Sequence, residues 1–490
     1  MSSAELETKQ LKREVLVRLV KAFLSDDFAE KTRLIPFDMR PKYSEVPFRC
    51  CVYKERGILR ARTLAGLGFS IEEDDETTLL SEYAKKAVSR TKLDPNPLTV
   101  VESACHSCQA ARVYVTDLCQ NCVARPCMNT CKFGAISHVD GKSVIDADKC
   151  KKCGQCIAAC PYGAIVKTVV PCENACPVGA IAKDERGFAR IDKEKCISCG
   201  KCVTACPFGA VHAKSQIIDV LKNIKEGKEV IALIAPALMG HLPCEPEQIY
   251  EALLKVGFAQ VYEVAEGADV TATTEAKDFQ ERLENGAPFM TTSCCAAYNE
   301  LVKKHMPEIK PYVSDAHTPL YYTAEIVKKE HPNAKTVFIS PCFAKRREVL
   351  DNSNVNYVMN FEELGAIFIA MGIEPAQCAN KEFKYQSSKE AREFALSGGV
   401  AKSVEAAWRG KPGALKPVLI NGLDKNAICD LKLYAKNGKC DKGNLIEVMA
   451  CPGGCIAGNA CMRDFKEAFK KVADYGKKAQ SLENRKDENG

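Results

Sequence analysis

The chain has no long apolar run, no apolar leader and little excess charge, and each absence excludes a class of protein. None of its apolar runs approaches the roughly 18 residues that a membrane-spanning helix needs. The N-terminus, MSSAELETKQLKREVL, carries acidic residues and lacks the apolar core of a secretion signal, so we expect a cytoplasmic protein without a disulfide framework. With 69 Lys and Arg against 63 Asp and Glu, the formal net charge of +6 is too weak to indicate nucleic-acid binding. The 46% of hydrophobic and 27% of charged residues are typical of a globular chain rather than a disordered one.

Cysteine is the residue type in excess. There are 28 cysteines against 7 His and a single Trp, and so many thiols in a reducing compartment predict metal ligands. Sixteen of the 28 lie between Cys105 and Cys206. Their distribution predicts an N-terminal region over 1–100, a cysteine-rich domain over 101–214, a third domain over 215–465, and a C-terminal helix with a polar tail over 466–490.

The N-terminal region contains only two cysteines, Cys50 and Cys51. Apolar residues at 11, 15, 19 and 23 recur every four positions, which predicts an amphipathic helix. We expect this mainly helical region to pack on its own protein rather than on a membrane, and its sequence assigns it no role.

The cysteine-rich domain contains an internal repeat. One motif, C-x3-C followed by a GA(I/V) segment, occurs four times. Two copies carry the full spacing C-x2-C-x2-C-x3-C-P, which is the bacterial ferredoxin signature. In that motif three thiolates bind one 4Fe-4S cube and the fourth binds the neighbouring cube. Zinc would need only two pairs of cysteines and does not explain the third cysteine or the proline. The complete copies are Cys150, Cys153, Cys156, Cys160 and Cys196, Cys199, Cys202, Cys206.

The other two copies of the motif are incomplete. If Cys105 and Cys108 supply the pair that is missing before Cys172, the cysteines of the domain suffice for four cubes. The crossing rule then predicts four ligand groups. They are Cys119, Cys122, Cys127 with Cys160; Cys150, Cys153, Cys156 with Cys131; Cys196, Cys199, Cys202 with Cys176; and Cys105, Cys108, Cys172 with Cys206. An alternative is a zinc ribbon of Cys105, Cys108, Cys119 and Cys122. Several cubes in one domain indicate an electron-transfer chain, and such a chain implies a reaction site at its end.

The third domain alternates apolar, β-prone runs such as EVIALIAPAL and KTVFISPC with helical stretches such as EPEQIYEALLKVG. This alternation is typical of a parallel sheet covered by helices, so we expect an α/β fold. Three cysteine islands, Cys294/Cys295, Cys342 and Cys451/Cys455, follow expected strands. Sites in open α/β sheets are built at such strand ends.

Three segments of this domain resemble, in order, the three H-cluster motifs of the FeFe-hydrogenases: TTSCCAAY at 291–298, SPCFAKRRE at 340–348 and EVMACPGGCIAG at 447–458. The resemblance covers roughly 230–460 and the cluster domain, and the layout is most similar to the group B branch. It implies a catalytic domain of two α/β lobes around the H-cluster, preceded by an α+β ferredoxin-like multi-cluster domain. The family's usual GGGQP after the third motif is GNACM here, which brings an unexpected Cys461 near the site.

The resemblance also implies the cofactor and its ligands. Cys295, Cys342, Cys451 and Cys455 match the thiolates of a 4Fe-4S cube, and Cys455 matches the bridge to a diiron subsite with CO, CN and azadithiolate. Lys345 matches the donor to a cyanide, and an ammonium suits an anionic ligand. Two further matches are Met449, which lines the subsite, and Glu348, which stands beside the lysine.

Proton delivery is implied in the same way. Cys294 matches the thiol that passes a proton to the bridging amine, and Ser314 matches a relay serine. The segment EGADVTATTEAKD resembles the family's glutamate motif, so Glu275 matches its relay glutamate and Asp278 a second carboxylate. Alternatively, Glu275 and Asp278 are surface carboxylates on one helical face.

These residues predict a cytoplasmic, anaerobic oxidoreductase that interconverts H2 with protons and electrons. The resemblance implies a ferredoxin or flavodoxin as electron carrier and dedicated maturation proteins for the H-cluster. Two alternatives are a hydrogen-sensing hydrogenase of low turnover and an iron–sulfur scaffold protein without the diiron subsite. The retained Cys294 and the additional cubes argue against the scaffold. We expect most of the unassigned cysteines to be buried small hydrophobes. They are Cys244, Cys378, Cys429, Cys440 and Cys461.

Overall fold

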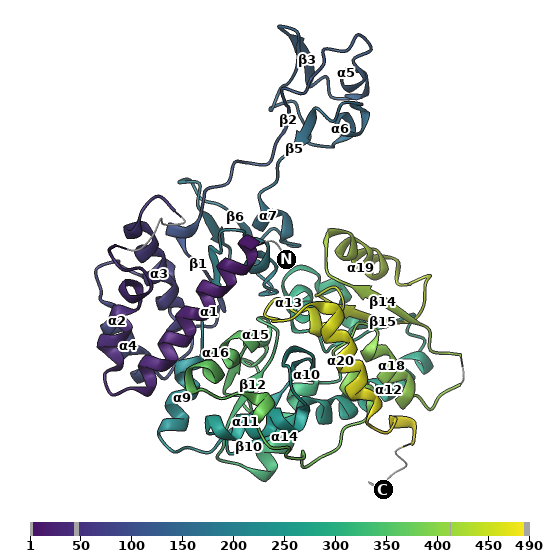
Figure 1. Ribbon diagram of the computed structural model, residues 1–490. Coiled ribbons are helices and arrows are strands. Elements are labelled where there is room, and N and C mark those ends of the chain that lie inside the picture. The colour runs from purple at the N-terminus through teal and green to yellow at the C-terminus, as the bar shows by residue number, and fades with distance from the viewer. Residues whose placement is uncertain (1–2, 44–48, 412, 485–490) are drawn as a thin grey trace.

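A computed structural model describes residues 3–43, 49–411 and 413–484. Its N-terminal region consists mainly of four helices, drawn in purple in Figure 1. The predicted amphipathic helix is confirmed, because α1 buries Val15, Leu19 and Phe23 in the main core of the protein. The helices are α1 (Ser3–Leu24), α2 (Phe28–Met39), α3 (Val52–Gly66) and α4 (Leu80–Ser89), with a short turn η1 (Ile71–Glu73).

The cysteine-rich domain consists of two nested modules, each with short antiparallel strand pairs and two five-residue helices. The inner module runs from β2 to β5, and the outer module is formed by the chain on either side of it. The outer module has β1 (Leu98–Val100) paired with β8 (Val211–Ala213), β6 (Ile181–Lys183) paired with β7 (Ala189–Ile191), η2 (Glu102–Ala104), α7 (Pro171–Ala175) and α8 (Lys201–Ala205). The inner module has β2 (Val113–Val115) paired with β5 (Ile165–Lys167), β3 (Ile136–Val139) paired with β4 (Lys142–Ile145), α5 (Pro126–Thr130) and α6 (Gln155–Ala159).

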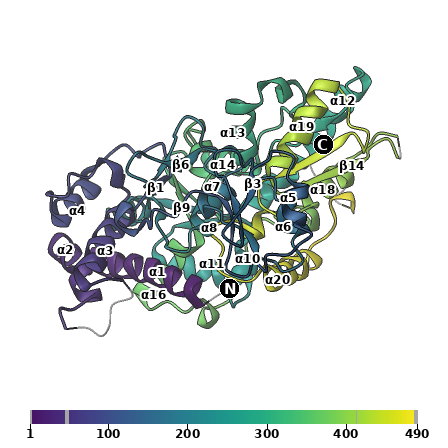
Figure 2. The same ribbon diagram turned by 90° about the horizontal axis from the view of Figure 1, so that it is seen from above.

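The inner module stands away from the rest of the molecule at the top of Figure 1, at the end of two extended connections. Seen from above in Figure 2, it lies over the middle of an elongated body that has α1–α4 at one end and α12, α18 and α19 at the other. The expected boundary at residue 100 falls at the end of β1, and β1 pairs with β8 of the outer module.

The third domain contains two parallel sheets, so the predicted pair of α/β lobes is confirmed. One has the order β10-β9-β12-β13 and the other β11-β15-β14. Strand β9 is buried along its whole length, as expected for an apolar strand that has helices on both faces. The strands are β9 (Val230–Ile234), β10 (Gln260–Glu263), β11 (Met290–Thr291), β12 (Lys335–Ile339), β13 (Tyr357–Met359), β14 (Pro417–Asn421) and β15 (Leu445–Met449).

Helices cover both sheets. Among them, α12 and α14 approach closely at Gly267, where a Cβ would lie 2.0 Å from the Pro319 carbonyl oxygen. The α-helices are α9 (Ile217–Lys225), α10 (Leu238–His241), α11 (Pro246–Val256), α12 (Val264–Glu284), α13 (Ala296–His305), α14 (Pro319–Glu330), α15 (Lys345–Glu348), α16 (Phe361–Met371), α17 (Lys389–Glu393), α18 (Gly399–Ala407), α19 (Lys425–Asn437) and α20 (Phe465–Lys477). The 3-10 turns are η3 (Pro307–Tyr312), η4 (Pro375–Gln377), η5 (Cys455–Ala457) and η6 (Leu482–Asn484).

Two further expectations concern the ends and the unassigned cysteines. Helix α20 forms near the predicted start of the C-terminal part, whereas the end of the expected polar tail, 485–490, lies outside the described residues. The expectation that most unassigned cysteines are buried is wrong: only Cys378 is buried, and Cys429 is exposed. Helix α19 turns only Ile428 and Leu431 inward, which leaves Cys429 facing solvent. None of the helices in the described part of the chain is both long and apolar enough to cross a bilayer.

Candidate functional site

Cysteines from three strand ends converge between the two lobes. Cys294 and Cys295 follow β11, Cys342 follows β12, and Cys451 follows β15. The turn from Cys451 to Cys455 needs Gly454, because its φ is +91° and a Cβ would lie 2.5 Å from the Ala395 carbonyl oxygen. The structure therefore brings together the four cysteines that the three sequence motifs predicted.

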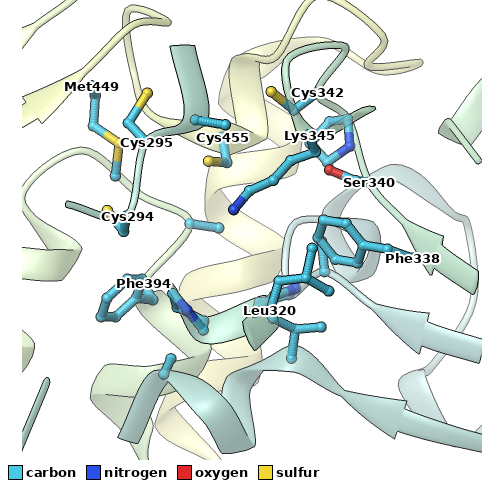
Figure 3. Close-up of a pocket in the computed structure, with 18 residues that line it drawn as sticks. Cys294, Cys295, Leu320, Phe338, Ser340, Cys342, Lys345, Phe394, Met449 and Cys455 are labelled. Carbon is cyan, nitrogen blue, oxygen red and sulfur yellow. The ribbon is translucent and has the colours of Figure 1, made fainter. Parts of the chain in front are cut away.

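A cavity of about 90 Å³ opens beside these cysteines. Figure 3 shows the thiols of Cys295, Cys342 and Cys455 along one side and the ammonium of Lys345 reaching toward the middle. Cys294 and Met449 lie at one end. The remaining wall is largely apolar and includes Ala235, Pro236, Val264, Ala268, Leu320, Phe338 and Phe394. Such a wall excludes water and strengthens any electrostatic interaction inside.

Burial makes ionisation of Cys342, Cys451 and Cys455 unfavourable. It raises the pKa of Cys342 to about 11 and that of Cys455 to about 12, and it holds the pKa of Cys451 well above its ordinary value; neighbouring thiols add to each shift. A cation bound among them would reverse this, because metal-bound thiols are deprotonated. The donor set is thus suited to iron, a metal for which soft thiolates have high affinity.

Lys345 remains charged inside this cavity. Burial alone would lower its pKa, but the Glu348 carboxylate, which accepts a hydrogen bond from Nζ at 2.6 Å, raises it above the ordinary value. Thr318 donates to the other oxygen of Glu348 at 2.7 Å and so fixes the carboxylate. The ammonium is held in place for an anionic ligand.

Glu275 lies behind Cys294 and is fully buried on α12, so it is not a surface carboxylate. Its Oε1 accepts a hydrogen bond from the Ser293 amide at 3.0 Å, and its Oε2 has no hydrogen-bond partner among the described residues. Burial raises the pKa of Glu275 to about 7. Burial, and then the Glu275 carboxylate, holds the pKa of Cys294 well above its ordinary value, so the thiol keeps its proton.

A second carboxylate, that of Asp278, connects this region with the surface. Ser314 Oγ donates to Asp278 Oδ2 at 3.0 Å, and Arg282 Nε donates to Asp278 Oδ1 at 2.6 Å. Arg282 also pairs with Asp315 at 2.6 Å, and the Asp315 side chain is 90% exposed. The predicted proton-relay residues thus lie in one region that extends from the cavity to solvent.

Sequence reasoning missed Ser293, Arg282, Thr318 and Asp315 in this arrangement. Arg282 had a usable signal, because it follows Asp278 by four residues on a helix, the spacing of an ion pair. Ser293 and Thr318 act through contacts between distant segments, which no local spacing reveals.

The inner module groups its eight cysteines around two cavities of about 20 Å³ each. One cavity is lined by Cys119, Cys122, Cys127 and Cys160. The other is lined by Cys131, Cys150, Cys153 and Cys156. In both groups the fourth cysteine comes from the other motif, as the crossing rule predicts.

The outer module groups its cysteines in the same way. Burial, and then the thiols of Cys199, Cys196 and Cys176, hold the pKa of Cys202 well above its ordinary value. Burial and Cys206 raise the pKa of Cys172 to about 11, with a further contribution from Cys108. Burial and then Cys206 raise the pKa of Cys108, with a smaller contribution from Cys105.

These groups bear on the zinc-ribbon alternative and on the kind of metal site. The zinc-ribbon alternative receives no support, because Cys105 and Cys108 lie with Cys172 and Cys206, apart from the cavity of Cys119 and Cys122. Within the described ranges, no three His, Cys, Asp or Glu side chains are placed to bind one metal ion together, which fits a cube, whose four irons each take one thiolate, rather than a single ion. Asn459 joins the outer module to the cavity, because its Nδ2 donates to the Cys199 carbonyl at 2.7 Å and lies 3.9 Å from Cys451 Sγ.

Comparison with known proteins agrees with this arrangement. Residues 228–459 match the family described as iron only hydrogenase large subunit, C-terminal domain. Residues 143–166 and 189–212 match a 4Fe-4S binding domain. Iron hydrogenase 1 of Clostridium pasteurianum is 29% identical over 66% of this chain and 65% of its own length. The chain thus spans less than two thirds of that relative.

Two further proteins are similar to parts of this chain. The periplasmic [Fe] hydrogenase large subunit of Nitratidesulfovibrio vulgaris is 29% identical over 50% of this chain and 72% of its own length. The structure of a variant of the apo [FeFe]-hydrogenase HydA1 from Chlamydomonas reinhardtii covers 56% of this chain and 92% of that chain, with 19% identity and a TM-score of 0.45. The matched family, the cysteine motifs and the two ferredoxin segments together show that residues 228–459 form a domain of the FeFe-hydrogenase family and that a ferredoxin-like iron–sulfur domain precedes it.

Proposed function

We propose that this protein is an FeFe-hydrogenase that catalyses reversible H2 oxidation and proton reduction at an H-cluster. The observation that carries the proposal is the convergence of Cys295, Cys342, Cys451 and Cys455 on a largely apolar cavity that also holds a charged lysine. When bound, the H-cluster supplies the redox chemistry that forms or splits H2. The thiols fit its cube, and the cavity beside Cys455 offers room and an ammonium donor for its diiron part.

The residues around the cavity have distinct roles in this proposal. Lys345, oriented by Glu348, donates hydrogen bonds to the anionic part of the cofactor. Met449 and the other apolar side chains exclude water from it. Cys294 carries protons between the cavity and Glu275, and Ser314 and Asp278 connect that region with the surface.

Electrons take a separate route in the proposal. The four thiol groups of the ferredoxin-like domain hold four 4Fe-4S cubes, and the group with Cys199 lies beside Cys451. Electrons pass through the inner module, whose position away from the body makes it accessible to a ferredoxin or flavodoxin (Figure 1).

Metal content tests the four-cube assignment. Before maturation of the diiron subsite, five cubes correspond to about 20 iron atoms per chain and no zinc. Iron and zinc analysis of anaerobically purified protein checks this count. A full equivalent of zinc would contradict it.

Hydrogen evolution from reduced methyl viologen by anaerobically matured protein tests the function itself. We expect turnover together with infrared bands of CO and CN. Bands without turnover would indicate a sensor, and matured protein without bands would indicate a scaffold, so either result would overturn the proposal.

A further inference from the structure

The loop that follows Cys206 lies against two cations from the N-terminal helices. Gly209, with a φ of +58°, brings this loop so close that a Cβ there would lie 3.1 Å from Arg62 Nη2 and 3.4 Å from Lys12 Cε. Arg62 lies on α3 and Lys12 on α1. A third cation, Arg49, donates to the Phe208 carbonyl at 3.1 Å and to the Ala104 carbonyl at 3.4 Å.

Arg62 is buried and makes no ion pair with any described residue. Arg62 is 3% exposed, and its Nε has no hydrogen-bond partner in the part of the chain that the structure describes. Among the described residues, Lys12 donates only to a backbone carbonyl, that of Val211, at 3.1 Å. The neighbouring His212 also has a buried Nε2 without a partner, and burial together with the two cations keeps it neutral by holding its pKa well below the ordinary value.

The acidic residues nearby are occupied elsewhere. Glu55 pairs with Arg40, Glu362 pairs with Arg13, and Glu363 pairs with Arg346. Burial lowers the pKa of Arg62 to about 10 and that of Lys12 to about 8. An unpaired buried cation such as Arg62 is unfavourable, and the partly buried Lys12 adds a second positive charge beside it, so an anion at this place stabilises the fold.

The anion that fits is the cube of the outer module. When ionised, the Cys206 sulfur stabilises the charge on Arg62 more than Glu55 does, and it also stabilises the charge on Lys12, where Glu362 contributes more. The loops of Cys105 and Cys206 are held together by His106, which stacks on Phe208 with ring centroids 4.7 Å apart. A 4Fe-4S cube with four thiolates carries a charge of about −2 when oxidised and about −3 when reduced.

We propose that Arg62 and Lys12 are positioning residues through which the N-terminal helices stabilise the reduced state of the cube held by Cys105, Cys108, Cys172 and Cys206. The inference rests on the proposed function, which assigns a cube to these thiols. Because the cations interact more strongly with the more negative reduced cube, they raise its reduction potential. This cube lies where the inner module joins the outer one. Its raised reduction potential therefore retains electrons that enter through the inner module at that junction.

Redox titrations of the complete protein, followed by electron paramagnetic resonance, test the inference. Arg62→Met removes the charge at nearly constant volume, and Arg62→Lys retains it. Lys12→Met is an independent second variant if Arg62→Met does not fold. The control is Arg18→Gln, which removes one positive charge from the exposed, Glu14-paired side of α1.

In Arg62→Met and Lys12→Met, we expect the equilibrium constant for reduction of one cube to fall about tenfold, which corresponds to 59 mV for one electron. Iron content, the other cubes, Arg62→Lys and Arg18→Gln should match the wild type. Unchanged potentials in both methionine variants would overturn the inference, and so would an equal shift in Arg62→Lys. A wild type without 4Fe-4S signals would instead overturn the proposed function.

Discussion

Replacing Cys294 by alanine is expected to abolish hydrogen turnover while leaving the H-cluster assembled. The titratable side chains that line the cavity are Cys294, Cys295, Cys342, Lys345 and Cys455. Three of these are proposed iron ligands, and Glu348 keeps Lys345 charged, so Cys294 is the group left to exchange protons. Loss of a positioned acid or base lowers rates by roughly 10²- to 10⁴-fold.

The measurement is hydrogen evolution by matured Cys294→Ala, with infrared spectra recorded on the same sample. Cys378→Ala is the matched control, since Cys378 is also buried but packs in the main core away from the cavity. A rate within a few-fold of the wild type, with CO and CN bands present, would show that protons take another route.

The sequence predicted which cysteines the fold brings together, because cluster chemistry constrains their local spacing. Two cysteines of the site come from one short turn, C-x3-C, and the other two follow strands of different sheets, at the strand ends where α/β sheets build their sites. The same reasoning predicted the grouping of Cys131 with Cys150, because the fourth cysteine of a ferredoxin motif crosses to the other cube.

What the sequence could not predict depends on contacts between distant segments. The nesting of one ferredoxin module inside the other requires β2 to pair with β5 and β1 with β8, and strands of three residues leave little periodic signal. Nor does spacing show that Glu275 is buried, because its neighbours on α12 include exposed polar residues. The cations of the N-terminal helices come next to Cys206 only in the folded chain.

Glu275→Gln is expected to lower turnover by roughly 10²-fold or more, since a glutamine keeps the shape of the side chain but cannot exchange a proton. It still accepts the hydrogen bond from the Ser293 amide, so the local fold should persist. The wild-type carboxyl has a pKa near 7, which lets it gain and lose a proton near neutral pH.

The pH dependence separates this role from a structural one. Below about pH 7 the carboxyl is protonated and donates toward Cys294, and above it the carboxylate accepts a proton. Hydrogen evolution by the wild type should therefore fall as the pH rises through about 7, and hydrogen oxidation should fall as the pH drops through it. Glu275→Gln should lose both transitions, whereas Glu281→Gln, the same change at an exposed position of α12, should keep them. Transitions that persist in Glu275→Gln would assign the titration to another group, because glutamine has no proton to exchange in this range.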